Sequence, residues 1–398
     1  MSMPSSAGMR AISLINADLG YAHASSLRIV GSILQSIGED PVRGDLVVDL
    51  RGDRVLPGLI NAHDHLQLNG FDRLKYRDRY SSARAWIDDV AHRRRTDSDL
   101  IACEAVPLRT RQVHGGLKNI LSGVTTVAHH DPVHESLLDT KFPTRVISAI
   151  GWSHSLQIDG ESEVQSAFQS TPAEWPWVIH AAEGVDVDAA GEFARLEALG
   201  CVAANTLIVH GVGLDKSQQE RLAMAGGGLI WCPSSNMHLF GATLDVAPLA
   251  SRHRVALGTD SRMTGERDLL SELSVARIAG GLEEQALESM VTGDAARLLR
   301  LKDRGALFPG GLADLVVLPA GMPVHQVCRA NIRLVMLNGE IRVGDALYAR
   351  ALAPARQLAE IELDGLPKLI DRELAELLTE LEVREPGLEM CQMTWRAA

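Results

Sequence analysis

Aromatic residues are scarce in this sequence: Phe, Trp and Tyr together make up 4% of 398 residues. A low aromatic content disfavours a surface on which nucleic-acid bases stack. The charge balance points the same way, because the net charge is -12 and the pI about 5.6, whereas nucleic-acid-binding domains carry a basic face. We therefore expect no nucleic-acid partner.

Cysteine is also sparse. The five cysteines are odd in number and widely spaced, and they contain no Cys-x-x-Cys pair: Cys103, Cys201, Cys232, Cys328 and Cys391. This pattern favours neither a disulfide framework nor a zinc finger. The sequence has no long apolar run and no signal peptide, so we expect no membrane partner and a cytoplasmic location.

Short strand-like segments occupy both ends of the chain. They lie at residues 11–16, 27–30, 33–37, 46–50, 314–318 and 332–337. The pair Asn338-Gly339 follows the last of them, and Asn-Gly between apolar segments is a strong hairpin signal. We predict that residues 1–56 and 305–350 together build one small β domain.

Between these ends, apolar strand-like segments alternate with helical ones, such as 189–199 and 269–278. The strand-like segments are 56–62, 124–128, 145–150, 177–181, 206–211, 228–232 and 255–259. Strand–helix alternation is typical of a parallel sheet. Seven strands are distinct; an eighth would lie within 151–176 or in the segment after His65.

The last part of the chain, residues 351–398, is predicted to form a helical C-terminal extension. Six apolar residues there have helical spacing: Leu366, Ile370, Leu374, Leu377, Leu378 and Leu381. We interpret this stripe as an ordinary packing face.

Metal-binding residue types recur where apolar segments end. The residues concerned are His63, His65, His180, Glu183, His210 and Asp260. Side chains two residues apart on a strand point to the same side, so His63 and His65 can bind one ion together. In a barrel, the carboxyl ends of all strands face one mouth, where the other residues would join them.

The residue types indicate hydrolytic chemistry. Neutral imidazoles with one carboxylate suit zinc, and also ferrous iron or manganese. Such an ion lowers the pKa of a water ligand toward ~7. Glu183, three residues after His180, can lie beside the ion without ligating it and carry protons, and Asp260 can both ligate and accept a proton. Attack at an amidine carbon with loss of ammonia would follow.

The pattern resembles the amidohydrolase superfamily, in the branch that contains cytosine, guanine and S-adenosylhomocysteine deaminases and the triazine hydrolases. The matching segments are residues 57–65, 180–183, 210, 232–236, 258–261, 314–317 and 337–339. The resemblance covers nearly the whole chain up to about residue 345. It implies an α/β fold: a distorted (β/α)8 TIM-type barrel over residues 57–304, with the small domain from both chain ends as a β-sandwich.

The resemblance also implies the roles of the site residues. One divalent metal, zinc first and Fe(II) or Mn next, would be held by His63, His65, His180 and Asp260. The catalytic residues would be Glu183 as proton carrier, His210 in contact with water or substrate, and Asp260. Binuclear members carry a bridging lysine at a middle strand end; residues 145–152 contain none, which favours a single ion.

The substrate-binding residues are weaker predictions. The candidates are Gln67, Trp86, His129 and His154. Gln67 and Trp86, like Tyr76, lie in a segment that often shapes the pocket in relatives. His129 and His154 follow strand-like segments, and for His129 and its neighbour His130 a structural role is favoured over substrate contact.

The predicted function is metal-dependent hydrolysis of a C–N bond in a small cyclic substrate, as in deamination of an aminated heterocycle or cyclic amidine with release of ammonia. One alternative is hydrolysis of a cyclic amide, an imide or a carbon–halogen bond with the same activated water. Another is a catalytically silent metal-binding protein. The partner would be a small molecule, and a homo-oligomer remains open. The substrate is not specified, because specificity resides in loops without a recognisable motif.

Overall fold

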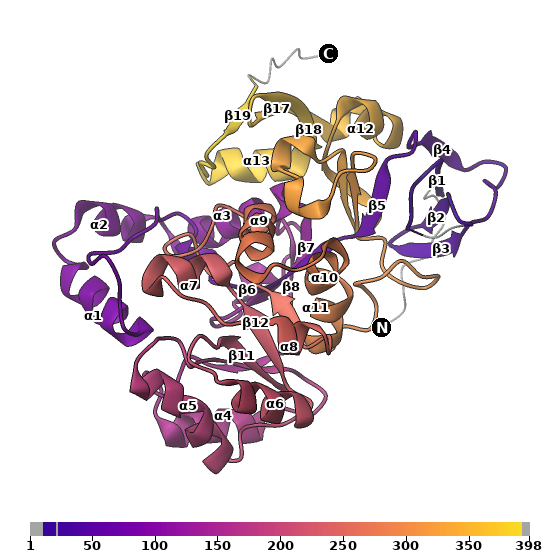
Figure 1. The fold of residues 1–398 in the computed structure, drawn as a ribbon. Helices are drawn as coiled ribbons and strands as arrows, with labels where there is room; N and C mark the ends of the chain where they lie inside the picture. The colour runs from indigo at the N-terminus through magenta and orange to yellow at the C-terminus, as the bar shows by residue number, and fades with distance from the viewer. Residues whose placement is uncertain (1–10, 21–22, 392–398) are drawn as a thin grey trace.

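The computed structural model describes residues 11–20 and 23–391. Within them the strands form four sheets: two parallel sheets in the middle of the chain, and a four-stranded and a seven-stranded sheet from its ends. Figure 1 shows the strands of the N-terminal segment beside the orange and yellow C-terminal part, with most helices around the parallel strands.

Eight parallel strands follow one another in chain order across the two central sheets. The three-stranded sheet contains β6 (Leu59–Asp64), β7 (Val124–His129) and β8 (Arg145–Val146). The five-stranded sheet contains β9 (Gly151–Ser153), β10 (Trp177–Ala181), β11 (Thr206–His210), β12 (Gly228–Trp231) and β13 (Val255–Leu257). Nearly all their residues are buried, as expected of parallel strands covered on both faces. The predicted parallel α/β arrangement is therefore confirmed.

The strand missing from the sequence pattern is β9. It pairs with β10 through Gly151 and Trp177, inside the predicted interval 151–176. It was hidden because it is three residues long and follows β8 after four residues, without a helix between them. The apolar segment 145–150 therefore looked like a single strand.

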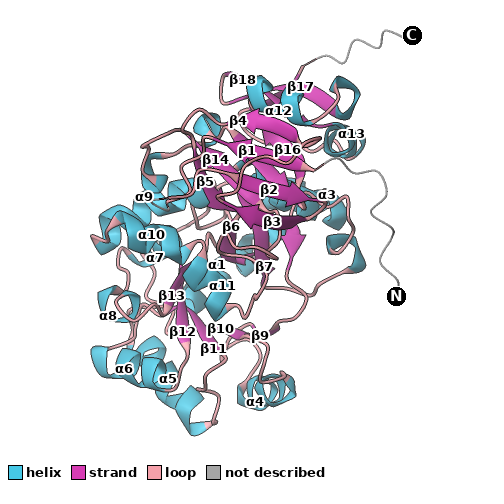
Figure 2. Cartoon of the chain, turned by 90° about the vertical axis from the view of Figure 1, so that its right-hand side faces the viewer, coloured by secondary structure: helices cyan, strands magenta, loops and turns pink. Residues whose placement is uncertain are grey.

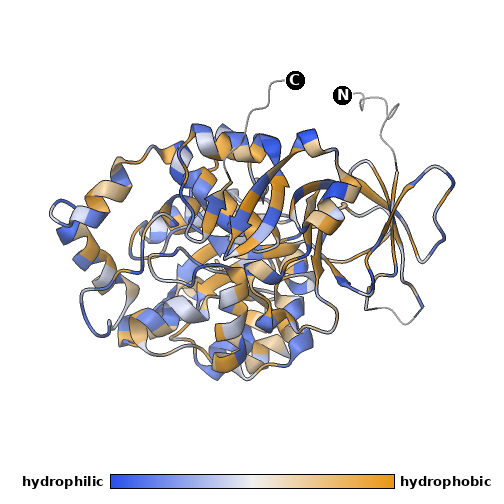
Figure 3. Ribbon diagram, turned by 90° about the horizontal axis from the view of Figure 1, so that it is seen from above, coloured by the Kyte–Doolittle hydropathy of each residue, from blue (hydrophilic) through white to orange (hydrophobic). Residues whose placement is uncertain are grey.

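Helices surround the parallel strands (Figure 2). They are α1 (Ala83–Arg93), α2 (Ser98–Ala105), α3 (Leu108–Leu121), α4 (Glu161–Ser170), α5 (Val187–Ala198), α6 (Lys216–Met224), α7 (Pro233–Phe240), α8 (Ala247–Ala250), α9 (Leu269–Gly280), α10 (Glu284–Met290) and α11 (Gly293–Leu298), with short 3₁₀ turns η1 (Leu66–Leu68) and η2 (Glu135–Leu137). Aspartates cap several of them, as Asp186 and Asp215 do for α5 and α6. In Figure 3 the strands are largely hydrophobic, whereas the helices around them carry both hydrophilic and hydrophobic residues.

The chain ends meet in the other two sheets. The four-stranded sheet has the order β3 (Ile33–Ile37), β2 (Leu27–Val30), β1 (Ile12–Ile15) and β4 (Leu46–Asp49). The seven-stranded sheet has the order β19 (Leu388–Met390), β17 (Leu358–Leu363), β18 (Leu366–Asp371), β16 (Glu340–Gly344), β15 (Leu334–Leu337), β14 (Leu315–Leu318) and β5 (Arg54–Pro57). Pairing of Pro57 with Leu315 joins the two ends, and one hydrophobic cluster contains Leu14 and Leu50 together with Leu315 and Leu334.

The predicted hairpin at Asn338-Gly339 is confirmed, since β15 and β16 pair on either side of it and both turn residues have positive φ. The rest of this region consists of η3 (Val324–Gln326), η4 (Arg329–Asn331), α12 (Ala346–Leu352) and η5 (Ala355–Gln357). These short elements connect β14 to β15 and β16 to β17.

The predicted helical extension over residues 351–398 is wrong for much of its length. Strands β17 and β18 form a hairpin on the seven-stranded sheet, β19 adds an edge strand, and the helix is limited to α13 (Arg372–Glu380). The cause is the turn Asp364-Gly365, where both residues have positive φ as a tight hairpin requires. The leucine stripe mixed two elements: Leu374 and Leu378 are buried on α13, whereas Leu366 is an exposed strand residue.

Among the described residues, no helix is long and apolar enough to cross a membrane.

Candidate metal centre and active site

The four predicted ligands lie at the carboxyl ends of three parallel strands. His63 is in β6 and His65 follows that strand directly, His180 is in β10, and Asp260 comes three residues after β13. Their donor atoms converge: His63 Nε2 is 3.2 Å from His180 Nε2, and Asp260 Oδ1 is 3.8 Å from His63 Nε2 and 3.7 Å from His65 Nε2. The structure therefore brings together the four side chains that the strand-end pattern had grouped.

The hydrogen bonds of His63 and His180 leave both Nε2 atoms without a proton. The Nε2–H of His130 donates to the carbonyl of Ser153 (2.9 Å), so its Nδ1 accepts the Nδ1–H of His63 (3.2 Å). His180 donates its Nδ1–H to the carbonyl of His154 (2.9 Å). Burial, followed by neighbouring imidazoles, lowers the pKa of His63 and of His180 well below the ordinary value, so both rings are neutral.

His65 is oriented in the same way by a carboxylate. Its Nδ1 lies 2.7 Å from Asp131 Oδ2, which directs Nε2 toward Asp260. Asp131 also accepts a hydrogen bond from Gln67 Nε2 (2.8 Å). Carboxylate-bound histidine of this kind is the usual arrangement behind a metal ligand.

Asp260 is held by three donors. Ser235 Oγ and Thr264 Oγ1 each donate to its Oδ2 (2.8 Å), and the backbone N–H of Ser261 donates to Oδ1 (2.8 Å). Burial opposes ionisation, but His210, His65 and His180 outweigh it and lower the pKa of the carboxyl. The backbone of Asp260 has φ +54°, a conformation uncommon for a residue with a side chain and one that occurs at functional sites.

This donor set fits a divalent metal ion. Two unprotonated imidazole nitrogens 3.2 Å apart repel each other unless a cation lies between them. Zinc bound tetrahedrally to two such nitrogens sets them ~3.3 Å apart. His63, His65 and Asp260 form one group of potential ligands within 4.8 Å, and His63, His180 and His210 form a second. Since His63 belongs to both, the two groups describe one centre.

Glu183 lies beside this centre and contacts His210. Its Oε1 is 3.4 Å from His210 Nε2, whose ring is fixed by a hydrogen bond from Nδ1 to Asn236 Oδ1 (2.8 Å). Burial, and then the carboxylates of Asp260 and Glu192, raise the pKa of Glu183 well above its ordinary value. The site therefore favours a protonated Glu183 that faces an acceptor nitrogen.

A short turn after β10 holds Glu183 in place. The N–H of Ala182, which has φ +53°, donates to Glu192 Oε2 on α5 (2.7 Å). The carbonyl of Glu183 accepts the N–H of Ala83 at the start of α1 (2.9 Å). Hydrogen bonds thus fix the backbone on both sides of Glu183.

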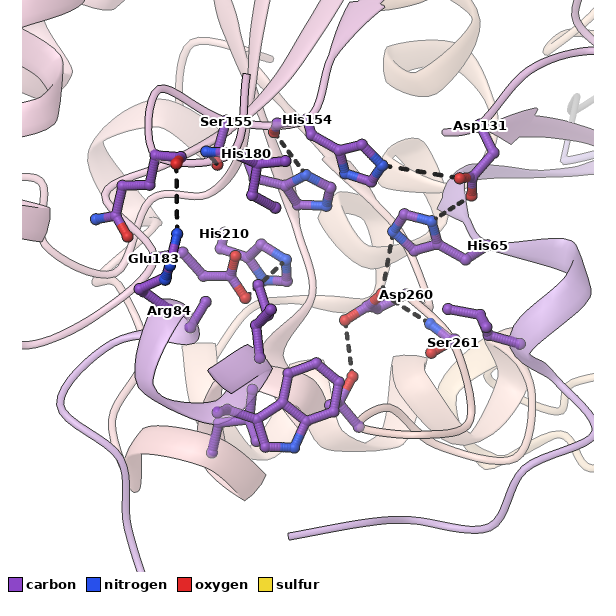
Figure 4. A pocket seen from close by; sticks show the side chains of 18 of the residues that line it. His65, Arg84, Asp131, His154, Ser155, His180, Glu183, His210, Asp260 and Ser261 are labelled. Carbon is purple, nitrogen blue, oxygen red and sulfur yellow. Dashed lines mark hydrogen bonds and ion pairs between the residues drawn. The ribbon is translucent and has the colours of Figure 1, made fainter. Parts of the chain in front are cut away.

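The cluster opens into a cavity of about 420 Å³ (Figure 4). Its polar floor contains His65, Asp131, His180, Glu183, His210 and Asp260. Its apolar wall contains Leu68, Ala83, Trp86, Ile87, Ile158 and Leu239. A floor of convergent polar groups under an apolar wall is typical of a small-molecule site.

Two of the four substrate-binding candidates, Trp86 and His154, line this cavity. Gln67 and His129 do not, so direct substrate contact is corrected for both. Gln67 instead supports Asp131, and His129 is buried with Nδ1 near the backbone of Asp64 and Leu66. Tyr76 lies outside the lining too, where its hydroxyl donates to Asp97 (2.9 Å).

Several supporting residues had no assigned role in the sequence. Asn236 ends the matching segment 232–236, and Asp131 directly follows His130, for which a structural role was expected. Their function of orienting a histidine ring depends on contacts between strands, which the sequence does not show. Glu192 carried no signal at all, because it is one acidic residue on an amphipathic helix.

Comparison with known proteins agrees with the resemblance. The model of the amidohydrolase family matches residues 161–342. A 5-methylthioadenosine/S-adenosylhomocysteine deaminase of Halobacterium salinarum is 26% identical over 384 residues, covering 80% of this chain and 87% of that protein.

Two solved structures show the same fold. A triazine hydrolase variant has a TM-score of 0.69 at 17% identity, covering 84% of this chain and 94% of that one. An adenosine deaminase from Xanthomonas campestris with bound zinc has a TM-score of 0.66 at 18% identity, covering 86% and 96%. The chain is therefore similar to the amidohydrolase family over residues 161–342 and to a deaminase over most of its length, and it shares its fold with the two solved structures.

Proposed function

We propose that this protein is a metal-dependent hydrolase that deaminates a small aminated heterocycle or cyclic amidine and releases ammonia. The observation that carries the proposal is Glu183, a mostly buried carboxyl with a raised pKa that lines the cavity beside both His210 and the ligand cluster. The deaminase relative from Halobacterium salinarum and the zinc-containing structural relative support it.

We propose that His63, His65, His180 and Asp260 hold one divalent ion, with zinc the first candidate because three imidazoles and a carboxylate suit it. When bound, such an ion lowers the pKa of a water ligand toward ~7 and polarises the atom under attack. We assign His210 to substrate contact and proton transfer, since its Nε2 lies 3.4 Å from Glu183 Oε1.

The fold around this site extends the same proposal. The eight parallel strands would close into a distorted (β/α)8 barrel over residues 57–304, in which β6 and β13 are neighbours; the Asp260 N–H donates to the His63 carbonyl (3.1 Å) at that junction. The segments at the two chain ends would form the small β-sandwich domain, which extends beyond residue 350 because β17, β18 and β19 belong to the same sheet as β14, β15 and β16.

In the reaction, the amidine carbon gains one C–O bond and loses its C–N bond to the amino group. Asp260 accepts a proton from the attacking water, because its carboxylate is ionised and lies beside the ligands. Glu183 delivers its proton to the ring nitrogen, and the proton held by Asp260 passes to the departing amine, so that ammonia leaves. The hydroxyl proton of the tetrahedral carbon returns to Glu183 as the carbonyl forms. The apolar wall around Trp86 shields these transfers from bulk water.

The test is a panel of purines, pyrimidines, pterins, triazines and cyclic ureas, scored for ammonia in the zinc-loaded protein and in the same protein treated with chelator. We expect ammonia from at least one compound, loss with chelator and recovery with added zinc. The His63→Ala variant should bind no stoichiometric metal and should release no ammonia. Chelator-resistant ammonia release would refute the metal-dependent mechanism.

The same panel separates the alternatives. Ring opening of a cyclic amide or imide without ammonia, or halide release from a chlorotriazine, would replace deamination with the other hydrolytic reaction of the same site. Stoichiometric zinc without turnover of any compound would favour a silent metal-binding protein.

A further inference from the structure

A fully buried polar network lies next to the proposed ligands, at the carboxyl end of β6. Its members are Asn61, Asp64, Asn69, Lys118, Asn119 and Thr259, each at most 1% exposed. Asp64 stands between His63 and His65 in the chain, but its carboxylate contacts Asn69, Asn119 and Lys118. None of the six lines the cavity, and the proposed reaction uses none of them.

Lys118, on α3, is the centre of the network. Its ammonium contacts Asp64 Oδ2 (2.9 Å), Asn69 Oδ1 (2.8 Å) and Thr259 Oγ1 (3.1 Å). These three contacts account for its three N–H donors. A buried lysine costs free energy unless it is fully paired, and here every donor has a partner.

The partners of Lys118 lie on two different strand ends. Thr259 precedes Asp260 and donates to its carbonyl (2.9 Å), whereas Asp64 is flanked by His63 and His65. Asn61 spans the same gap: its amide donates to Thr259 Oγ1 (2.8 Å) and its carbonyl oxygen accepts the Thr259 N–H (3.1 Å). Side chains therefore connect the end of β6 to the end of β13 through several bonds.

These strand ends need such a connection. β6 and β13 belong to different sheets, so no ladder of paired residues sets their register within the described structure. The backbone contributes the bond from Asp260 N–H to the His63 carbonyl (3.1 Å). Yet His63, His65 and Asp260 must meet around a single ion.

We propose that Lys118 is a positioning residue that sets the register of β6 against β13 and so aligns His63 and His65 with Asp260. The inference rests on the metal site of the proposed function but not on the identity of the substrate. It concerns the geometry of binding and is tested by metal binding itself.

The experiment compares Lys118→Met with the wild type by zinc competition against a chromophoric chelator and by the visible absorption spectrum of the cobalt(II)-loaded protein. We expect zinc affinity to fall by about 10- to 100-fold, the usual effect of removing a partner that orients a ligand. The cobalt spectrum should change, because its bands report ligand geometry.

A matched control is Lys368→Met in the seven-stranded sheet. Lys368 is also a buried lysine, paired with Asp345 and the carbonyl of Ile332, but it lies in a different sheet from the ligands. If buried lysines matter only for folding, both variants should lose thermal stability and keep wild-type affinity and spectrum. That result would overturn the proposal.

Thr259→Val provides the milder second variant and decides the matter if Lys118→Met does not fold. It removes the hydroxyl shared by Lys118, Asn61 and the Asp260 carbonyl while keeping the side-chain shape. A smaller affinity loss with a changed cobalt spectrum supports the inference, and unchanged binding refutes it. Wild-type protein that binds neither ion would instead refute the proposed function.

Discussion

At the scale of single residues, a substitution of Glu183 distinguishes a role in proton transfer from a purely structural role of this side chain. Glu183→Gln keeps the size and hydrogen-bonding capacity of the side chain but removes the proton that its raised pKa favours. We expect turnover to fall by roughly 10²–10⁴, the usual effect of losing a general acid or base, while bound metal stays near one ion per chain. Rate and metal content should be measured on one preparation.

The control for this substitution is Glu197→Gln. Glu197 pairs with Arg221 on the protein surface and takes no part in the cavity. Its variant should match the wild type in rate and stability. Near-normal turnover of the Glu183→Gln variant would show that the carboxyl only braces the strand end.

The sequence predicted those site residues best whose position at the end of a strand determines where the side chain points. A histidine or aspartate that ends a parallel strand faces the same mouth as its counterparts, so His63, His180, His210 and Asp260 could be grouped without knowing any contact. The orienting partners could not be predicted in this way. Whether Asp131 contacts His65, or His130 contacts His63, depends on side-chain directions across neighbouring strands.

At the scale of elements, the packing of α9 against α7 contains a buried acid that couples folding to pH. Glu272 on α9 is fully buried and accepts the N–H of Ser234 (2.9 Å) at the start of α7. Burial is the main cause that raises the pKa of Glu272 to about 8. It is therefore protonated in the folded protein at neutral pH and ionised in the unfolded chain.

This difference makes the folded state less stable as pH rises from about 5 to 8, because the folded protein retains a proton that the unfolded chain releases. The slope for one proton is about 1.4 kcal/mol per pH unit at most. Glu272→Gln removes the titration, so its thermal unfolding midpoint should fall less than that of the wild type between pH 5.5 and 8. Equal pH dependence of the two proteins would contradict the assignment.

Local patterns also explain which elements were predictable. The Asn338-Gly339 hairpin has a turn signal between two clearly apolar strands, and the structure has it in that place. The Asp364-Gly365 turn carries the same kind of signal, but leucines spaced like a helix on both sides concealed the alternation in β17 and β18. Strand β9 was concealed by its length, because three residues carry no periodicity.

At the scale of the whole molecule, the C-terminal segment is tied to the loop that follows Asp260, a proposed metal ligand. Glu385, just before β19, has a fully buried carboxylate that binds Arg262 through two bonds (2.7 and 2.8 Å). It also contacts Arg329 and accepts a hydrogen bond from His114 Nε2 (2.8 Å). Arg262 is only two residues after Asp260, so the last strand of the chain braces the site.

Removing this carboxylate should destabilise both the fold and the metal centre. Glu385→Ala leaves Arg262 without its carboxylate and takes one partner from the buried Arg329, and breaking a buried ion pair typically costs about 3–5 kcal/mol. We expect a lower thermal unfolding midpoint and weaker zinc binding, because the loop that carries Asp260 loses its brace. Glu389→Ala, at an exposed position of β19, is the control and should match the wild type. If Glu385→Ala unfolds and binds zinc like that control, the C-terminal strand only covers a sheet edge and contributes nothing to the site.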